Sequence, residues 1–323
     1  MKKVAVVVLA STLLMLSTAL APFLATVSCS LPYTETIGKL GGADFLIRLP
    51  YPITNWNGEL VIFCSGYSTS VTDIAKVLPS AHTISSNLIP LGYAIAFSNF
   101  GEGGFCRQKA AIRTHQLTEW VVDNYSVTGK IYLIGVSMGG NVALELGAKY
   151  PALYDGVIDL CAPKDMAFEY TDKTFLAGLS LPNLQIELSS RGVPFSPLPS
   201  LAAYKFICGK MATDIAAECG GTPDTKPKEY ERISPIYSAL GIVVPTITLH
   251  GTKDSLVPYA ESVAYKNAVT SAGQSDLYRL YIVSDAIHGG STLFAQLFQP
   301  PYSAFYQLVD WVENGNSADP SST

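Results

Sequence analysis

One serine lies in a sequence context that suits a nucleophile. Gly135-Val136-Ser137-Met138-Gly139 follows an apolar, β-branched run and precedes an alanine- and leucine-rich helical pattern. The spacing matches G-x-S-x-G, a sharp strand-to-helix turn that lifts the serine oxygen clear of the sheet. Glycines are expected there because neighbouring backbones approach too closely to leave room for a Cβ atom. The alternative is a glycine-rich turn that carries an incidental serine.

A serine hydroxyl needs a base, and the chain contains four histidines. His288 lies in "SDAIHGG" after the last predicted strand, where two glycines allow the loop to carry the imidazole over the sheet edge. His82 and His115 fall within predicted helices, and His250 ends an apolar strand, which suits a structural residue. His288 is therefore the predicted base.

The base needs an acid to orient it, and "LHGTKDSLVP" places Asp254 in the loop after the penultimate predicted strand. The chain order Ser137, Asp254, His288 recurs in enzymes that carry this strand-turn-helix motif. Asp159, within an earlier strand, stays an alternative acid because triad arrangements vary. Asp285 is interpreted as a residue that hydrogen-bonds within its loop.

Two backbone amides are expected to bind the oxyanion of the tetrahedral intermediate. The amide of Met138 lies at the start of the helix after the serine, and the second amide is predicted at Tyr67, where Gly66 lets the backbone turn inward in "VIFCSGYSTS". The ring of Tyr67 either stacks on a substrate group or forms part of the pocket wall.

These residues need a sheet to position them, and short apolar runs alternate with amphipathic segments along the chain. This alternation favours an α/β fold with a mostly parallel central sheet flanked by helices. The predicted strands are 58–67, 92–101, 130–137, 154–163, 241–251 and 277–285, and the predicted helices are 71–91, 108–124, 139–149, 259–272 and 291–313.

One interval, 164–239, interrupts the alternation because it is rich in proline and aromatic residues. A structureless loop of that length is improbable in a compact domain, so we predict an inserted, mainly helical cap or lid. The core then comprises 31–163 and 240–314, and the polar tail 315–323 is predicted to be disordered.

The N-terminal segment 1–30 predicts export. Lys2 and Lys3 precede an uncharged stretch, 4–31, whose most apolar part, 4–16, has the length of a signal-peptide core, and Ala19-Leu20-Ala21 is a candidate cleavage site. A retained membrane anchor and a lipoprotein ending its leader at Cys29 are the alternatives. All three possibilities predict a secreted or extracytoplasmic domain. The anchor and the lipoprotein would also tether this domain to a membrane.

Six cysteines are compatible with an oxidising compartment. The sequence predicts one disulfide between Cys208 and Cys219 and a second between Cys64 and Cys106, with Cys161 as a buried free thiol. There is no C-x-x-C pair, so structural zinc has no support. The serine chemistry requires no cofactor.

The charge distribution argues against nucleic acid as a partner. The net charge is −5 and no cluster of lysine and arginine occurs, whereas phosphate binding needs grouped basic residues. The expected partner is a small-molecule or polymeric ester.

Taken together, the serine turn, the "HGTKDSLVP" loop and the "IHGG" loop resemble the α/β-hydrolase superfamily over about 43–312, apart from the cap. The Gly66-Tyr67 turn is similar to that of bacterial cutinase-like polyester hydrolases, in which the tyrosine amide contributes to the oxyanion hole. The long insertion instead resembles capped esterases, including feruloyl-esterase-like members.

The resemblance implies an exported serine esterase that acts on lipophilic or aromatic acyl groups, or on a polyester, through an acyl-enzyme intermediate. A peptidase or an acyltransferase with the same triad is the alternative, because the fold does not determine the acceptor. A third hypothesis is a non-catalytic surface-binding protein that uses the fold as a scaffold.

Overall fold

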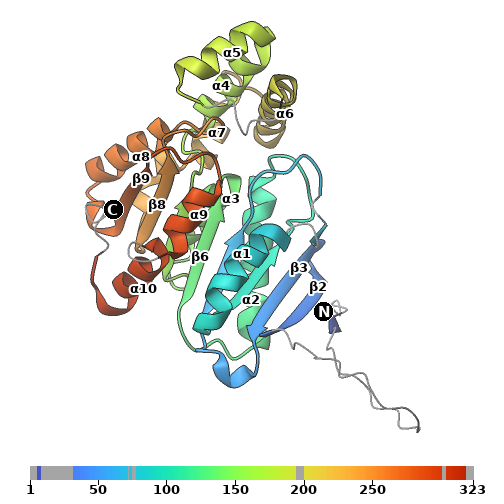
Figure 1. Ribbon diagram of the computed structural model, residues 1–323, viewed down its shortest axis with the longest axis vertical. Coiled ribbons are helices and arrows are strands. Elements are labelled where there is room, and N and C mark those ends of the chain that lie inside the picture. The colour runs from blue at the N-terminus through green and yellow to red at the C-terminus, as the bar shows by residue number, and fades with distance from the viewer. Residues whose placement is uncertain are drawn as a thin grey trace, which may run out of the picture.

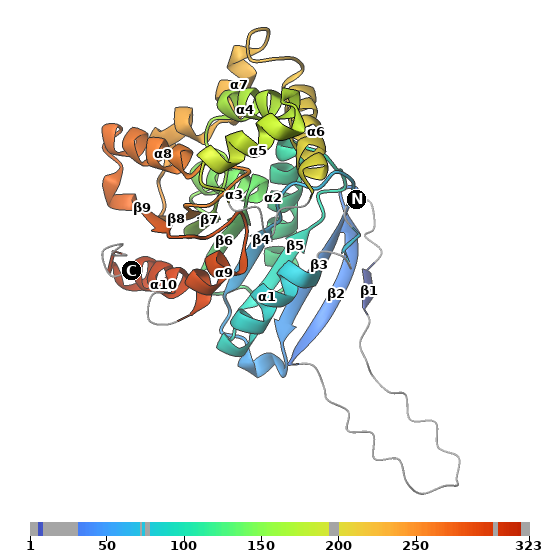
Figure 2. The same ribbon diagram turned by 45° about the horizontal axis from the view of Figure 1, so that its top comes forward.

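The computed structural model describes residues 6–8, 32–71, 73–74, 78–193, 200–299 and 303–317. The strands are β1 (Val6–Val8), β2 (Tyr33–Leu40), β3 (Ala43–Pro50), β4 (Leu60–Cys64), β5 (Ala94–Ser98), β6 (Ile131–Val136), β7 (Gly156–Leu160), β8 (Thr246–Gly251) and β9 (Tyr278–Val283). Within the described residues they form one sheet in the order β1-β2-β3-β5-β4-β6-β7-β8-β9 (Figures 1 and 2). The strands from β5 to β9 are parallel, and β1, β2 and β3 pair antiparallel.

Helices cover both faces of this sheet because the central strands are apolar on both sides. Leu60 and Ile62 point into the cluster beneath α2 (Arg107–Asn124), α3 (Met138–Lys149) and α8 (Tyr259–Ser271). Val61 and Phe63 alternate with them and pack under α1 (Leu78–Leu88), α9 (Ser291–Phe298) and α10 (Ala304–Asn314). This two-sided burial is typical of parallel sheets and explains the continuous apolar runs in the sequence.

The predicted α/β fold is confirmed, and each of the six predicted strands corresponds to one of the strands from β4 to β9. Short 3-10 turns join several elements: η1 (Ile53–Asn55), η3 (Ile89–Leu91), η4 (Pro235–Gly241) and η5 (Ser275–Leu277). The helix predicted over 291–313 is instead the pair α9 and α10. Pro300 and Pro301 lie between them in the sequence, and proline cannot continue a helix interior.

The sequence prediction missed the antiparallel hairpin of β2 and β3. Gly41 and Gly42 both have positive φ, at 60° and 99°, which is the two-residue turn that matches the twist of a hairpin. The sequence feature that could have indicated the hairpin is the Gly41-Gly42 pair between the two short segments that form β2 and β3. This hairpin extends the sheet on the side away from β9.

The insertion between β7 and β8 is mainly helical, as predicted (Figure 2). It contains α4 (Met166–Gly178), α5 (Leu181–Ser190), α6 (Leu201–Cys219) and α7 (Pro227–Ile233). Side chains of Asp165, Ser180 and Ser200 cap the first three helices by accepting hydrogen bonds from first-turn amides. Since the insertion leaves the sheet where β7 ends, the cap lies over the carboxyl ends of the parallel strands (Figure 1).

The disulfide prediction is wrong for both pairs. Cys64, Cys106, Cys161, Cys208 and Cys219 are all free and buried. Cys208 and Cys219 lie on the same helix, about 16 Å apart along its axis, too far for a disulfide. Cys64 contacts Thr114 and the thiol of Cys106 approaches the Glu102 carbonyl, so each has a neighbour other than cysteine. The prediction that Cys161 is a buried free thiol is confirmed.

The predicted leader and tail fall mainly outside the described residues. Only Val6–Val8 of 1–30 and residues 315–317 of the tail are described. Among the helices that are described, none is long and apolar enough to span a membrane. Export and the exact domain boundaries stay predictions.

Candidate active site

Ser137 occupies the strained turn that the sequence predicts. It lies between β6 and α3 with φ 55° and ψ −124°, a conformation that residues with a Cβ atom rarely adopt. Its amide donates to the Leu160 carbonyl at 2.8 Å, and its carbonyl accepts from the amide of Gly140 at 2.9 Å. These bonds hold the serine in a conformation that is strained at a site of predicted chemistry.

The flanking glycines are required by close backbone contacts. A Cβ atom at Gly135 would overlap the carbonyl of Gly139, and one at Gly139 would overlap the carbonyl of Cys64 at the end of β4. Both neighbours are backbone atoms, which cannot move aside as a flexible side chain would. The local sequence pattern therefore has a direct steric cause.

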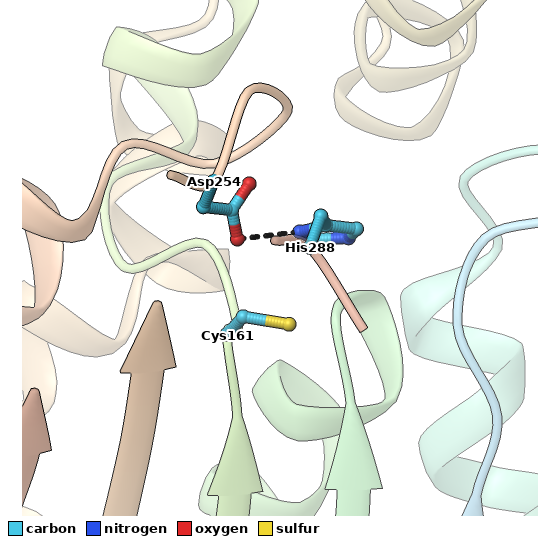
Figure 3. A group of neighbouring side chains, drawn as sticks. All are labelled: Cys161, Asp254 and His288. Carbon is cyan, nitrogen blue, oxygen red and sulfur yellow. Dashed lines mark hydrogen bonds and ion pairs between the residues drawn. The ribbon is translucent and has the colours of Figure 1, made fainter. Parts of the chain in front are cut away.

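Asp254 and His288 are joined directly, although they come from different loops. The Nδ1 atom of His288 lies 2.7 Å from Oδ2 of Asp254 (Figure 3). The amides of Leu256 and Val257 donate to Oδ1 of the same carboxylate at 2.9 and 2.8 Å. Since the carboxylate accepts, Nδ1 of His288 carries the proton in the neutral ring, and Nε2 is left as the basic nitrogen.

A second histidine contacts the same carboxylate. Nε2 of His250 lies 2.8 Å from the Val257 carbonyl and 3.2 Å from Oδ2 of Asp254, and its Nδ1 lies 2.7 Å from Oγ of Ser262. The structural interpretation of His250 missed its contact with Asp254. Its place at a strand end, four residues before Asp254, was the available signal.

The two charges of this pair shift each other's titration. Burial raises the pKa of Asp254, but His288 and His250 outweigh burial, so the pKa lies well below its usual range. Burial lowers the pKa of His288, but the Asp254 carboxylate outweighs it, and the pKa lies well above its usual value. The pair therefore favours an imidazolium beside a carboxylate, the charge state that follows proton transfer from a serine.

Loop contacts bring the histidine loop and the serine turn together. A Cβ atom at Gly289 would lie 3.6 Å from Cγ1 of Val136, the residue before Ser137. The amide of Lys253 donates to the Ala286 carbonyl at 3.0 Å, which joins the acid loop to the histidine loop. Within the described residues Ser137 and His288 share no hydrogen bond, and such bonds are often long in the absence of substrate.

The predicted oxyanion turn lies over the serine. A Cβ atom at Gly66 would lie 3.3 Å from Cβ and 3.9 Å from Oγ of Ser137. Met138 is the first residue of α3, where an amide has no carbonyl of its own helix to bind. Met138 follows Ser137 in the chain, and Tyr67 follows Gly66, which lies next to Ser137 in space. Both predicted amide donors therefore belong to segments adjacent to the serine.

The side chain of Tyr67 reaches the cap. Its hydroxyl donates to Oδ2 of Asp214 on α6 at 2.8 Å, and Lys210 forms an ion pair with the other oxygen of that carboxylate. Burial and the neighbouring Asp214 raise the pKa of Tyr67 well above its usual value. No sequence pattern indicates Asp214, because the contact depends on where the cap helix lies.

The other two aspartates considered for the acid, Asp159 and Asp285, have different hydrogen-bond partners. Asp159 is fully buried and accepts from Thr248 at 2.8 Å, from the Ala162 amide and from Lys164, with which it forms an ion pair. Asp285 is exposed, and its backbone amide donates to Thr252 at 2.9 Å.

The two remaining histidines are also separate from the pair. His82 is exposed, and His115 stacks on Tyr150 with ring centroids 3.7 Å apart. Neither contacts Asp254 or His288 within the described residues.

Comparison with known proteins places the chain in a family. Residues 114–289 match the family described as serine aminopeptidase, S33, and this span contains Ser137, Asp254 and His288. The monoacylglycerol lipase of Mycolicibacterium smegmatis is 26% identical over 259 residues, which cover 73% of this chain and 84% of that protein.

Solved structures share the fold at low identity. An esterase/lipase from an uncultured bacterium aligns with a TM-score of 0.58 at 14% identity, covering 88% of this chain and 85% of that one. The Pyrococcus horikoshii acylaminoacyl peptidase aligns with a TM-score of 0.58 at 12% identity, covering 88% of this chain, which spans only 42% of the peptidase. The chain belongs to the serine aminopeptidase S33 family and is a serine hydrolase of the α/β-hydrolase type.

Proposed function

We propose that this protein hydrolyses carboxylic esters through an acyl-enzyme intermediate on Ser137. The observation that carries the proposal is the 2.7 Å hydrogen bond between His288 and Asp254, in a loop that contacts the turn bearing the strained serine. Nε2 of His288 would take the proton of Ser137 as the serine oxygen attacks the ester carbonyl, and Asp254 would stabilise the imidazolium.

The same histidine completes the reaction. It gives its proton to the leaving alcohol, then takes a proton from the water that attacks the acyl-enzyme, and returns this proton to the Ser137 oxygen as the acid is released. The amides of Tyr67 and Met138 are proposed to bind the oxyanion in both steps. One such donor typically contributes about 3–4 kcal/mol to transition-state stabilisation.

A lipophilic acyl ester is the proposed substrate class. The relative from Mycolicibacterium smegmatis is named for monoacylglycerol, and the cap of this chain exposes large apolar side chains. They are Phe168, Phe175, Leu181, Ile186 and Phe206. An apolar outer surface favours interaction with apolar substrates over charged ones. Aromatic acyl esters and polyesters are also included among the proposed substrates.

The experiment is a substrate panel with wild type and Ser137→Ala. It comprises p-nitrophenyl esters of increasing chain length, a monoacylglycerol, a feruloyl ester, a solid polyester and a peptide anilide. We expect hydrolysis of the esters, no cleavage of the anilide, and a loss of about 10⁴-fold or more in the variant. Unchanged activity in Ser137→Ala would disprove the mechanism, and faster anilide cleavage would favour the peptidase alternative.

Two further outcomes separate the remaining alternatives. If added alcohol diverts the acyl group from water, the protein is an acyltransferase. If a fluorophosphonate probe does not label Ser137 in the folded protein, the non-catalytic hypothesis replaces the enzymatic ones.

We also propose that the protein acts outside the cytoplasm, because an uncharged apolar stretch follows Lys3 at the N-terminus. The mass and location of the mature protein test this. Full-length protein in the cytosolic fraction would contradict it.

A further inference from the structure

Cys161 lies beside the His288–Asp254 pair and has no role in the proposed reaction. It follows β7, is fully buried, and has φ 49°, which is unusual for a residue with a Cβ atom. Its amide donates to the Leu249 carbonyl at 2.9 Å. The backbone is thus fixed at a point where Figure 3 shows the sulfur directed toward the space between β7 and the histidine.

The three side chains can act as ligands to one ion. Ligand atoms of Cys161, Asp254 and His288 all lie within 4.8 Å of one another. Thiolate, carboxylate and imidazole are the donors that Zn²⁺ prefers, and three protein ligands with a fourth open position are a common zinc arrangement. A thiolate and a carboxylate together supply two negative charges, which offset the charge of the ion.

Neighbouring groups orient the carboxylate for this role. The amides of Leu256 and Val257 hold Oδ1 of Asp254, so Oδ2 is the oxygen available to an ion. His250 lies 3.2 Å from the same Oδ2 and limits its movement. Hydrogen bonds of this kind to a ligand typically strengthen metal binding.

We propose that Cys161, Asp254 and His288 form a binding site for a single Zn²⁺ ion, which inhibits the enzyme when bound. The ligand atoms of a tetrahedral zinc site lie about 3.3–3.7 Å apart, so the 2.7 Å contact between His288 and Asp254 must open slightly as the ion enters. Entry is from the His288 side, because its side chain is 15% exposed whereas that of Asp254 is fully buried.

Binding removes the base whichever ring nitrogen is the ligand. The thiol proton of Cys161 is released to solvent as the Zn–S bond forms, and a His288 imidazolium likewise loses one ring proton before it binds the ion. If zinc binds Nδ1, the ring proton resides on Nε2, which then has no lone pair for the proton of Ser137. If zinc binds Nε2, it occupies that lone pair directly. The inhibition rests on the proposed function, whereas the binding does not.

Binding is measured first, without substrate. Equilibrium dialysis of the full chain against Zn²⁺ should give one ion per chain. Cys161→Ser preserves the size of the side chain and should weaken binding by about 100-fold or more, and His288→Ala should weaken it similarly. Cys208→Ser, a buried cysteine of the cap, is the matched control and should bind zinc as wild type does.

A spectroscopic measurement needs no variant. Co²⁺ bound to wild type should show the near-ultraviolet absorption of a thiolate-to-cobalt transition, which excess Zn²⁺ should remove. Absence of that absorption, or equal zinc affinity in wild type and Cys161→Ser, would overturn the site.

Inhibition is measured second, with each variant referred to its own metal-free rate. Zinc should inhibit wild type and Cys208→Ser at the concentration at which it binds, and a chelator should restore the rate. Cys161→Ser should need about 100-fold more zinc. Zinc binding by a protein that hydrolyses no ester would contradict the proposed function but leave the site intact. Binding without inhibition of an active enzyme would overturn the inhibitory role.

Discussion

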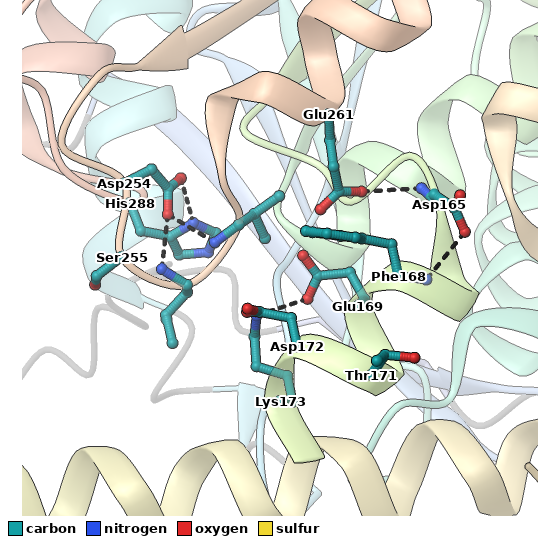
Figure 4. Close-up of polar contacts among 12 residues, drawn as sticks. Asp165, Phe168, Glu169, Thr171, Asp172, Lys173, Asp254, Ser255, Glu261 and His288 are labelled. Carbon is teal, nitrogen blue, oxygen red and sulfur yellow. Dashed lines mark hydrogen bonds and ion pairs between the residues drawn. The ribbon is translucent and has the colours of Figure 1, made fainter. Parts of the chain in front are cut away.

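Asp254 and Glu261 are two buried carboxyl groups whose pKa values are shifted in opposite directions. Burial raises the pKa of both, but Asp254 faces His288 and His250, which lower its pKa well below the usual range. Glu261, on α8, faces Glu169 of the cap helix α4, and this second carboxyl raises its pKa well above the usual value (Figure 4). Burial alone therefore does not determine ionisation; the neighbouring groups do.

The two carboxyl groups differ in the hydrogen-bond donors that surround them. At the candidate site each oxygen of Asp254 has a donor, so the carboxylate remains charged. At the junction of cap and core, Oε2 of Glu261 accepts from the amides of Lys164 and Asp165, whereas Oε1 has no hydrogen-bond donor among the described residues. The first arrangement suits catalysis, and the second makes the position of the cap sensitive to protonation.

The largest expected effect is at the site. Asp254→Asn should lower kcat by about 10⁴-fold, because an amide cannot stabilise the imidazolium or hold the same histidine tautomer. Loss of the carboxylate should also lower the pKa of His288. The residual activity should therefore persist to lower pH than in wild type, where the raised pKa keeps the ring protonated and inactive.

Asp159→Asn is the matched comparison, because Asp159 is equally buried but contacts Lys164 instead of a histidine. It should lower stability while the folded fraction keeps wild-type kcat. A loss of kcat at Asp159 with little change at Asp254 would reverse the acid assignment. Steady-state kinetics over pH, with the folded fraction measured by circular dichroism, distinguishes the two.

The next largest effect is at the junction. Lys173 is fully buried and forms ion pairs with Glu169 at 3.0 Å and with Asp172 at 2.8 Å. Lys173→Met should reduce the free energy of unfolding by about 3–5 kcal/mol, because it leaves the buried Glu169 carboxylate without its cation and Asp172 with Arg191 alone. Urea denaturation measures this against Lys228→Met, the same change at an exposed position of α7. Equal stability of the two variants would show that the cation does not hold the junction.

A smaller effect is expected where the cap meets the oxyanion turn. Tyr67→Phe preserves the backbone amide and the ring but removes the hydrogen bond to Asp214. We expect kcat/KM to fall about fivefold, which corresponds to the loss of about 1 kcal/mol from one hydrogen bond. Tyr237→Phe, at an exposed tyrosine, is the control and should have wild-type kinetics. A fall of 100-fold or more would indicate that the hydroxyl itself contacts the substrate.

The smallest effect concerns Glu261. Its folded pKa is raised, so the folded state binds the proton more tightly, and wild type should lose stability as pH rises from about 4.5 through the raised value. Glu261→Gln keeps an oxygen for the amides of Lys164 and Asp165 and can donate to Glu169, so this loss should disappear.

Urea denaturation of wild type and Glu261→Gln at several pH values tests this. The groups that face Glu261 are Glu169, itself paired with Lys173, and the backbone amides of Lys164 and Asp165. The variant should gain stability relative to wild type as pH rises. Glu231→Gln, at an exposed position, should show no such trend. A constant difference across pH would contradict the raised pKa of Glu261.

Local sequence determined a large part of this protein. Close backbone contact at Gly135 and Gly139 gives the serine turn its motif, and two-sided burial gives the parallel strands their continuous apolar runs. The predicted chain order of Ser137, Asp254 and His288 followed from loops at strand ends, because such loops meet at one edge of a parallel sheet. Roles at these residues stay predictions until kinetics tests them.

Tertiary structure alone decided which distant groups meet. The prediction of a Cys208–Cys219 disulfide is wrong because both residues lie on one helix, and spacing in the sequence did not reveal that. Contacts such as Tyr67 with Asp214, Glu169 with Glu261 and Cys161 with His288 join segments far apart in the chain. The first two depend on how the cap docks and how its helices are rotated, and the third depends on how the loops after β7 and β9 meet; a motif within one segment carries no information on either. The sequence thus predicted the reacting groups, and the fold decided their neighbours, their ionisation and the candidate zinc site.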